Sequence, residues 1–187
     1  MSKVQTDNSY LAAKVELRAE HLPSGPVRVL DCYAGTGRIW REVRRRCPQR
    51  RIRVTGIDTR RLPGIYLRGD NRKFLGAMDL EPFNVIDLDA YGVPFQQMDI
   101  LFGRRRGTAK TVFVTFIQTV MGRLPDGLLR ALGYTDSMCR KCPTLLCRDG
   151  LAKIKAYLSI RGVTEIVRYS SGDGRKYYLS FTLEPNA

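Results

Sequence analysis

A strand, a glycine-rich turn and a helix follow one another near the start of this chain. Residues 27–30 (VRVL) have the composition of a buried strand, the sequence DCYAGTG at 31–37 follows directly, and residues 38–46 read as a helix. The same alternation then repeats. Further apolar runs lie at 52–57, 65–67, 83–88 and 111–116, and helical segments lie between them at 72–78, 95–102 and 126–132. Strands that alternate with helices favour right-handed βαβ units, which build a mostly parallel sheet with helices on both faces.

The two ends of the chain extend this pattern in different ways. A helix is predicted over 9–21, where apolar residues recur at helical spacing. Near the other end, two β-rich runs at 163–169 and 177–183 are joined by a short polar link with two glycines, which is a hairpin signal. We therefore predict one α/β domain over 1–187, with a Rossmann-like, mostly parallel seven-stranded sheet that ends in an antiparallel hairpin. Residues 1–26 would form the N-terminal helix that leads into this sheet.

Acidic residues stand where several of the predicted strands end. In open α/β sheets, ligands bind beyond the carboxyl ends of the strands. Gly35 and Gly37 allow a ligand to approach the backbone, and Asp58 stands where an acidic residue accepts hydrogen bonds from ribose hydroxyls. The turn lacks the third glycine of a pyrophosphate-binding loop, because Trp40 takes its place, and Asp31 would repel a phosphate. A cationic nucleoside such as S-adenosylmethionine answers this description. The acidic residues concerned are Asp31, Asp58, Asp70 and Asp89.

Three segments carry a resemblance to a known family. Residues 27–37 resemble the first motif of class I S-adenosylmethionine-dependent methyltransferases, and residues 56–58 (GID) resemble the second, ribose-binding motif. Residues 67–71 (LRGDN) resemble the segment whose acidic side chain accepts from the adenine amino group. The resemblance implies the class I methyltransferase fold and S-adenosyl-L-methionine as cofactor. The cofactor-binding residues that it implies are Asp31, Tyr33, Gly35, Gly37, Asp58, Asp70 and Asn71.

Residues 85–94 (VIDLDAYGVP) resemble the fourth motif of the tRNA guanine-N2 dimethyltransferase family, and the likeness to its catalytic domain extends faintly over 27–183. The resemblance implies that Asp89 accepts N–H bonds from a target amine and that Tyr91 stacks on the base, which orients the nitrogen lone pair for methyl transfer. Ala90 replaces a proline of that family, and the additional C-terminal domain of its larger members is absent. Substrate recognition would then fall to this domain itself or to a separate protein partner.

The charge balance favours a polyanionic partner. The sequence holds 32 Lys and Arg against 18 Asp and Glu, a formal net charge of +14. Basic residues placed on phosphates release condensed counterions, so nucleic acid is the favoured partner and an anionic membrane surface is the competing one. Each basic cluster could also be a solvated helix face. The predicted nucleic-acid-binding residues are Arg44, Arg45, Arg46, Arg104, Arg105 and Arg106.

The cysteines and the hydropathy pattern bear on metal binding and location. Cys139, Cys142 and Cys147 offer three thiolates, whereas a closed structural zinc site needs four ligands, with Cys47 a conceivable fourth. We predict no metal site. No apolar run approaches the ~20 residues of a membrane-spanning helix, and the first ten residues are polar, so we expect a cytoplasmic protein with reduced thiols and no membrane association.

Together these features predict an S-adenosylmethionine-dependent methyltransferase that acts on an exocyclic base amine of nucleic acid. Guanine N2 of tRNA is the favoured target. Two alternatives stay open on the sequence: a DNA amino-methyltransferase, and a non-catalytic subunit with the methyltransferase fold that binds RNA and supports a partner enzyme. The acidic residues at the strand ends, Asp31, Asp58 and Asp89, argue against the non-catalytic alternative.

Overall fold

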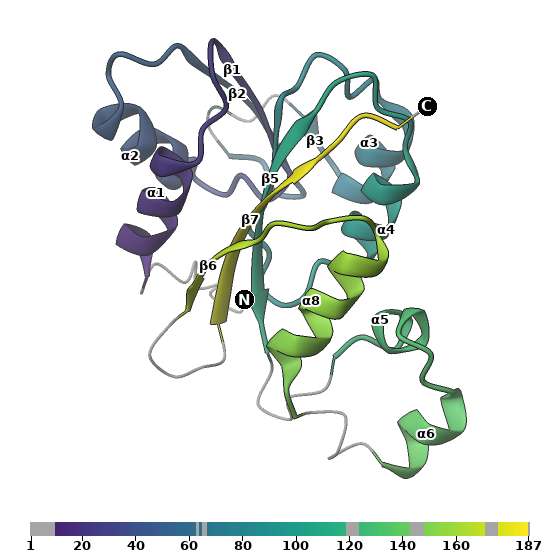
Figure 1. Cartoon of the computed structure of the whole chain (residues 1–187). Helices are drawn as coiled ribbons and strands as arrows, with labels where there is room; N and C mark the ends of the chain where they lie inside the picture. The colour runs from purple at the N-terminus through teal and green to yellow at the C-terminus, as the bar shows by residue number, and fades with distance from the viewer. Residues whose placement is uncertain are drawn as a thin grey trace.

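The computed structural model describes residues 10–62, 64, 67–118, 124–142, 148–170 and 176–186. Within them, strands form one seven-stranded sheet in the order β3-β2-β1-β4-β5-β7-β6 (Figure 1). The strands are β1 (Val27–Asp31), β2 (Ile52–Asp58), β3 (Leu67–Arg68), β4 (Val85–Leu88), β5 (Lys110–Ile117), β6 (Val167–Ser170) and β7 (Lys176–Leu183). The helices are α1 (Leu11–Glu20), α2 (Arg38–Arg46), α3 (Asn71–Ala77), α4 (Phe95–Gly103), α5 (Asp126–Ala131), α6 (Asp136–Lys141) and α8 (Gly150–Ile160).

The sheet has the predicted mixture of directions. Strand β1 pairs in parallel with β2 and β4, while β3 and β5 extend the parallel part on either side. Strand β7 pairs antiparallel with both β5 and β6. The predicted α/β class, the mostly parallel sheet and its antiparallel end are therefore confirmed. The link 171–175 between β6 and β7 lies outside the described residues.

Each face of the sheet has its own hydrophobic core, because successive side chains of a strand point to opposite faces. Val29 of β1 and Val85 of β4 pack with Trp40 against α1 and α2. Their chain neighbours, Leu30 and Ile86, pack in the second core with residues of α3, α4 and α8. Figure 1 shows α1 and α2 beside one face and α3, α4 and α8 on the other. The predicted covering of both faces is confirmed.

Strand β6 and helix α6 differ from the sequence prediction, and strand β4 begins at Val85 rather than at residue 83. Strand β6 begins at Val167 rather than at residue 163, because the Val163 amide donates to the carbonyl oxygen of Leu158 at 3.0 Å and so closes the end of α8. Gly162, at φ +83°, supplies the left-handed turn that this closure needs. Helix α6 was not predicted. Its N-cap is Thr135, whose side chain accepts from the Met138 amide, which is a local signal visible in the sequence.

Candidate functional site

A cleft of about 610 Å³ lies beyond the carboxyl ends of β1, β2 and β4. This volume is within the range of roughly 300 to 1,000 Å³ that is typical of small-molecule sites. Most of the predicted cofactor and catalytic residues line it. Those residues are Tyr33, Gly35, Asp58, Asp70, Asn71, Asp89 and Tyr91. Asp31 lines a smaller adjoining pocket, which shares Lys14, Gly35 and Asp89 with the cleft, so the predicted residues meet at one edge of the sheet.

The glycine-rich turn joins β1 to α2 at this edge. Gly35 and Gly37 have φ angles of +53° and +68°, a backbone conformation that glycine adopts without steric cost. The Gly37 amide closes the turn by donating to the carbonyl oxygen of Ala34 at 2.7 Å. The Gly35 amide donates to Oδ2 of Asp58 at 3.0 Å. The turn and the end of β2 are thus held together as one wall of the cleft.

Asp31 and Asp87 lie side by side at the ends of neighbouring parallel strands, on the face that α1 and α2 cover. Arg18 of α1 donates to both carboxylate oxygens of Asp87, from Nε at 2.7 Å and from Nη2 at 2.6 Å. Trp40 of α2 donates its indole N–H to Oδ2 of the same carboxylate at 2.8 Å. The Arg18 and Asp87 side chains are each only 1% exposed. Asp87 is therefore a structural anchor for the two helices.

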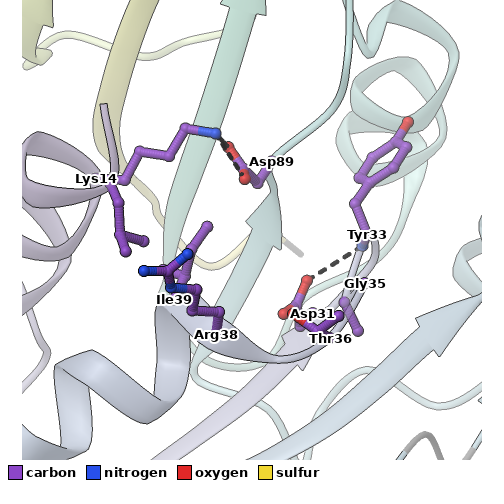
Figure 2. Close-up of a pocket in the computed structure, with 10 residues that line it drawn as sticks. Lys14, Asp31, Tyr33, Gly35, Thr36, Arg38, Ile39 and Asp89 are labelled. Carbon is purple, nitrogen blue, oxygen red and sulfur yellow. Dashed lines mark hydrogen bonds and ion pairs between the residues drawn. The ribbon is translucent and has the colours of Figure 1, made fainter. Parts of the chain in front are cut away.

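Asp89 follows β4 and lines both the cleft and the smaller adjoining pocket, which Figure 2 shows. Lys14 of α1 places Nζ 2.9 Å from its carboxylate, and the hydroxyl of Thr115 on β5 donates to Oδ1. The Asp89 side chain is 12% exposed. These two donors leave acceptor capacity on the carboxylate, since an ionised carboxylate offers about four lone-pair positions. Of the two acids in this segment, Asp89 borders the space where a ligand can lie.

Asp31 has an unusual electrostatic environment. Burial, and then the neighbouring Asp87 carboxylate, raise its pKa well above its usual value. The Tyr33 amide donates to Oδ1 of Asp31 at 3.1 Å, the contact drawn in Figure 2. Among the described residues, no lysine or arginine lies within ion-pair distance of Asp31, in contrast to Asp87 and Asp89. A cationic ligand group in the adjoining pocket would therefore relieve the repulsion between these carboxylates.

Asp58 and Asp70 lie on the opposite side of the cleft, and each is held by an arginine two residues later. Arg60 donates to both oxygens of Asp58, and Arg72 donates to both oxygens of Asp70. Burial alone would raise the pKa of Asp58, but the hydrogen bonds from Arg60 and from the Gly35 amide lower it. The hydrogen bonds from Arg72 lower the pKa of Asp70 to about 2. Both carboxylates are ionised at neutral pH.

Asn71 and Tyr33 also line the cleft. Asn71 donates from Nδ2 to the carbonyl oxygen of Cys32 at 2.7 Å, and its Oδ1 accepts from Gln97 at 2.8 Å. These bonds tie the start of α3 to the end of β1 and to α4. Burial raises the pKa of Tyr33 to about 12, so its hydroxyl stays protonated. Asn71 therefore positions the cleft wall as well as lining it.

Tyr91 stands at the edge of the cleft and is 82% exposed. The next residue, Gly92, has φ +128°, and its carbonyl oxygen accepts from the Ile117 amide at 2.8 Å. This bond fastens the segment after β4 to the end of β5. The aromatic ring is thus presented to solvent from an anchored backbone, which suits it for contact with a planar ligand.

The arginines at the end of α2 do not line the cleft, although Arg44 lines a separate pocket beside the glycine-rich turn. Arg44 donates to the carbonyl oxygen of Ile52, the first residue of β2, at 3.2 Å. Arg45 pairs with Glu42 at 3.0 Å, and Arg46 pairs with Glu16 of α1 at 3.6 Å. All three arginines are exposed. A helix that follows a parallel strand runs back along the sheet, which carries its last turn away from the ligand edge.

The second predicted arginine cluster is not a surface cluster. Arg106 is only 8% exposed and donates to the carbonyl oxygens of Leu101, Arg104 and Glu184. Arg104 is half-buried and donates to the carbonyl oxygen of Met78 at 2.8 Å. The expectation of a surface cluster is therefore wrong for Arg106, and of the three residues only Arg105 is exposed. Buried carbonyl groups need donors, and a guanidinium with five N–H groups supplies them here.

Several residues of the site were not predicted from the sequence. Lys14 and Arg18 come from α1, where their spacing of four residues places them on one helix face, yet nothing local indicates their partners. Trp40 was noted only as the residue in place of a third glycine. Arg60 and Arg72 could have been found, because both follow a predicted cofactor carboxylate at the same spacing.

The cysteines that the structure describes do not come together as ligands of a metal ion. Cys139 is buried and Cys142 is exposed, while Cys147 lies outside the described residues. Within the part of the chain that the structure describes, no three His, Cys, Asp or Glu side chains gather as metal ligands would. In the same part of the chain, none of the helices has both the length and the apolar character needed to cross a bilayer.

Comparison with solved structures shows which known proteins share this backbone fold. No protein-family model and no curated protein matches the sequence. The 1,6-didemethyltoxoflavin-N1-methyltransferase of Burkholderia thailandensis, solved with S-adenosylhomocysteine, is 14% identical with a TM-score of 0.53, and the match covers 97% of this chain and 80% of that one. A candidate ribosomal RNA methyltransferase from Plasmodium falciparum is 14% identical with a TM-score of 0.52, covering 97% and 99% of the two chains.

A candidate O-methyltransferase from Nostoc punctiforme is also similar, at 14% identity and a TM-score of 0.54. The match covers 94% of this chain and 56% of that protein, so the chain spans little more than half of its length. Likeness at this level of identity concerns the backbone fold alone. The chain has the Rossmann-like fold of class I S-adenosylmethionine-dependent methyltransferases.

Proposed function

We propose that this protein is an S-adenosylmethionine-dependent methyltransferase that acts on an exocyclic base amine of nucleic acid, with guanine N2 of tRNA as the target. The observation that carries the proposal is the position of Asp89 and Tyr91. A carboxylate with acceptor capacity and an exposed aromatic ring border one cleft, beside the glycine-rich turn and across from Asp58. The methyltransferase fold supports the same reading.

The residues of the cleft fit S-adenosylmethionine. The ionised carboxylates of Asp58 and Asp70 suit the ribose hydroxyls and the adenine amino group, and the cleft that they line is large enough for a nucleoside. Asp31, which has no lysine or arginine of the described residues within ion-pair distance, suits the cationic methionine end. Gly35 keeps the turn free of a side chain at the point of approach. The bound cofactor supplies an electrophilic methyl group on a sulfonium.

Asp89 and Tyr91 would prepare the target amine. An amine conjugated to a purine ring is a weak nucleophile, because its lone pair is delocalised. Asp89 accepts an N–H of this amine and so turns the lone pair toward the cofactor side of the cleft, while Tyr91 stacks on the base and fixes its plane. Lys14 and Thr115 hold the Asp89 carboxylate in place. Positioning of this kind needs no metal ligand from the protein.

A nucleic-acid substrate is supported by the charge of the chain, +14, and by arginines on the cleft itself. The exposed residues Arg44, Arg45 and Arg46 do not line the cleft, so they would contact the substrate away from the target base. Recognition of the position to be modified would then depend on contacts near the cleft or on a separate protein partner.

The direct test is mass analysis of nucleosides after incubation of the purified protein with S-adenosylmethionine and bulk tRNA. The expected product is N2-methylguanosine, with no methylated nucleoside in a parallel reaction on DNA. Methylated adenine or cytosine in the DNA reaction would assign the chain to DNA amino-methylation instead. Cofactor binding without transfer to either nucleic acid would contradict the proposed activity.

Replacement of Asp58 with alanine is expected to weaken S-adenosylmethionine binding about ten- to a hundredfold. Hydrogen bonds to a charged group contribute roughly 1.5 to 3 kcal/mol, and alanine removes the acceptor of the ribose hydroxyls. Calorimetric titration measures the change, with a thermal melt to verify folding. Asp99→Ala is the matched control, because Asp99 is an exposed carboxylate of α4 outside the cleft. Equal affinity of the Asp58 and Asp99 variants would remove Asp58 from the cofactor site.

Replacement of Tyr91 with alanine is expected to weaken nucleic-acid binding by about five- to a hundredfold, since stacking of a base on an aromatic ring is worth roughly 1 to 3 kcal/mol. Folding should be unaffected, because the side chain is 82% exposed. Tyr91→Phe keeps the ring and should retain the affinity of the natural protein for tRNA in an anisotropy titration. If phenylalanine lost as much affinity as alanine, the hydroxyl rather than the ring would be the contact.

A further inference from the structure

Two carboxylates of the cleft, those of Asp58 and Asp70, each accept hydrogen bonds from an arginine two residues later in the chain. Oδ1 of Asp58 accepts from the backbone amide of Arg60 at 2.8 Å and from its Nε at 3.1 Å. Oδ2 accepts from Nη2 of Arg60 at 3.2 Å and from the Gly35 amide at 3.0 Å. Because a carboxylate offers about four lone-pair positions, Asp58 has none left for a ribose diol while Arg60 stays in place.

Asp70 shows the same pattern on the neighbouring loop. Arg72 donates to Oδ1 from its backbone amide at 2.9 Å and from Nε at 3.0 Å, and to Oδ2 from Nη2 at 2.5 Å. Its remaining nitrogen, Nη1, donates to Gln96 at 2.6 Å. In the structure described here, arginine thus covers both carboxylates that suit the nucleoside part of the cofactor.

A ligand can displace these two arginines from their carboxylates. The Arg60 and Arg72 side chains are 42% and 48% exposed, and ion pairs as exposed as these contribute little to stability. Both arginines line the cleft that Asp89 and Tyr91 border. A guanidinium keeps its charge at any physiological pH, and its planar fork matches the oxygens of a phosphate. Once displaced from its carboxylate, each side chain is a free cation at the mouth of the site.

We propose that Arg60 and Arg72 couple the two substrates: the nucleoside part of S-adenosylmethionine displaces them from Asp58 and Asp70, and the released guanidinium groups bind phosphates of the nucleic acid. This inference rests on the proposed function. It assigns the phosphate contacts nearest the target base to Arg60 and Arg72, at the cleft, where the predicted clusters on α2 and after α4 do not reach. Cofactor and nucleic acid then bind with positive cooperativity.

Cooperativity of this kind is reciprocal, because each ligand must change the affinity of the other by the same factor. It also has an electrostatic signature. Each arginine released onto a phosphate should increase the slope of log affinity against log salt by about 0.7 on a single strand and 0.9 on a duplex. The cofactor should therefore make nucleic-acid binding both tighter and more sensitive to salt.

The experiment measures binding of fluorescently labelled tRNA by anisotropy across a salt series, with and without saturating S-adenosylhomocysteine. For the natural chain, S-adenosylhomocysteine should tighten tRNA binding by at least about fivefold and steepen the salt slope. In the double variant Arg60→Ala/Arg72→Ala, both effects should vanish, while S-adenosylhomocysteine alone binds more tightly, because its competitors are gone. Arg28→Ala/Arg51→Ala, which removes two exposed arginines outside the cleft, should keep both effects.

The outcomes separate this inference from the function on which it rests. If each ligand binds the natural chain alone but S-adenosylhomocysteine changes neither tRNA affinity nor salt slope, the coupling is refuted while the proposed function stands. Persistence of the full coupling in Arg60→Ala/Arg72→Ala would refute the assignment of these two residues. If the natural chain binds neither tRNA nor S-adenosylhomocysteine, the proposed function itself fails, and the coupling fails with it.

Discussion

Asp89→Asn is expected to slow methyl transfer by about 10²- to 10⁴-fold while S-adenosylmethionine still binds. The variant keeps the shape of the side chain but replaces one acceptor oxygen with an N–H donor group. Lys14 and Thr115 both donate to Asp89, and the target amine would donate as well, so an amide at this position meets donors on every side. Single-turnover transfer of labelled methyl to tRNA measures the chemical step apart from product release.

The control for this prediction is the same substitution at Asp87, two residues earlier in the chain. Asp87 and Asp89 share a face of the sheet, but Asp87 is bound to Arg18 and Trp40 and does not line the cleft. At a temperature where both variants are folded, Asp87→Asn should transfer methyl groups much faster than Asp89→Asn. A full rate in Asp89→Asn would show that another group accepts from the amine.

Asp87→Asn is expected to lower the free energy of unfolding by about 3 to 5 kcal/mol. The substitution removes the carboxylate that compensates the Arg18 guanidinium, and both side chains are only 1% exposed, so solvent cannot take its place. Burial acts to lower the pKa of Arg18, and its pairing with Asp87 acts to raise it. Because a guanidinium is not deprotonated in proteins, Arg18 would stay charged in the variant, with Asp89 at 4.0 Å as its nearest remaining ion-pair partner among the described residues. Urea unfolding monitored by circular dichroism measures the loss as a lower midpoint at unchanged slope.

A double-mutant cycle separates the ion pair from the rest of the substitution. Arg18→Met removes the cation and leaves Asp87 beside Asp31, so it should also be destabilising. The double variant Arg18→Met/Asp87→Asn should lose less stability than the two single losses combined, since neither partner is left alone. An exposed ion pair contributes roughly 0 to 1 kcal/mol to stability. If Asp87→Asn lowered the free energy of unfolding by no more than this, the burial of the Arg18–Asp87 pair would be contradicted.

Helix α1 therefore belongs to the site as well as to the core. Lys14 and Arg18 bring two positive charges to the face where Asp31, Asp87 and Asp89 gather. Arg18 contacts Asp87 and lies 4.0 Å from Asp89, and Lys14 contacts Asp89, whereas Asp31 has no lysine or arginine of the described residues within ion-pair distance. Under the proposed function, Asp87 serves the structure and Asp89 positions the substrate, while the repulsion around Asp31 would favour binding of a cationic cofactor.

The sequence by itself determined the order of the strands along the chain and the edge at which the candidate site lies. The alternation of apolar runs with helical segments depends on local periodicity. The connections between parallel strands are right-handed as a rule. The carboxyl ends of parallel strands share one edge of a sheet, so acids at those ends meet there. The cleft accordingly includes Asp58, Asp70 and Asp89, with Asp31 in the adjoining pocket.

Only the tertiary structure decided which charged groups pair. Lys14 and Arg18 contact acids 75 and 69 positions away, and no local pattern encodes the packing of α1 on the sheet that brings them together. Packing of the end of α4 beside the segment after β7 turned Arg106 inward to the backbone carbonyl oxygens of Leu101 and Glu184, although its neighbours in the sequence suggested a surface cluster. Hydrophobic periodicity specifies which face of an element is buried. Which charged side chains pair depends instead on the distances between elements, and these distances are determined by the packing of the two hydrophobic cores.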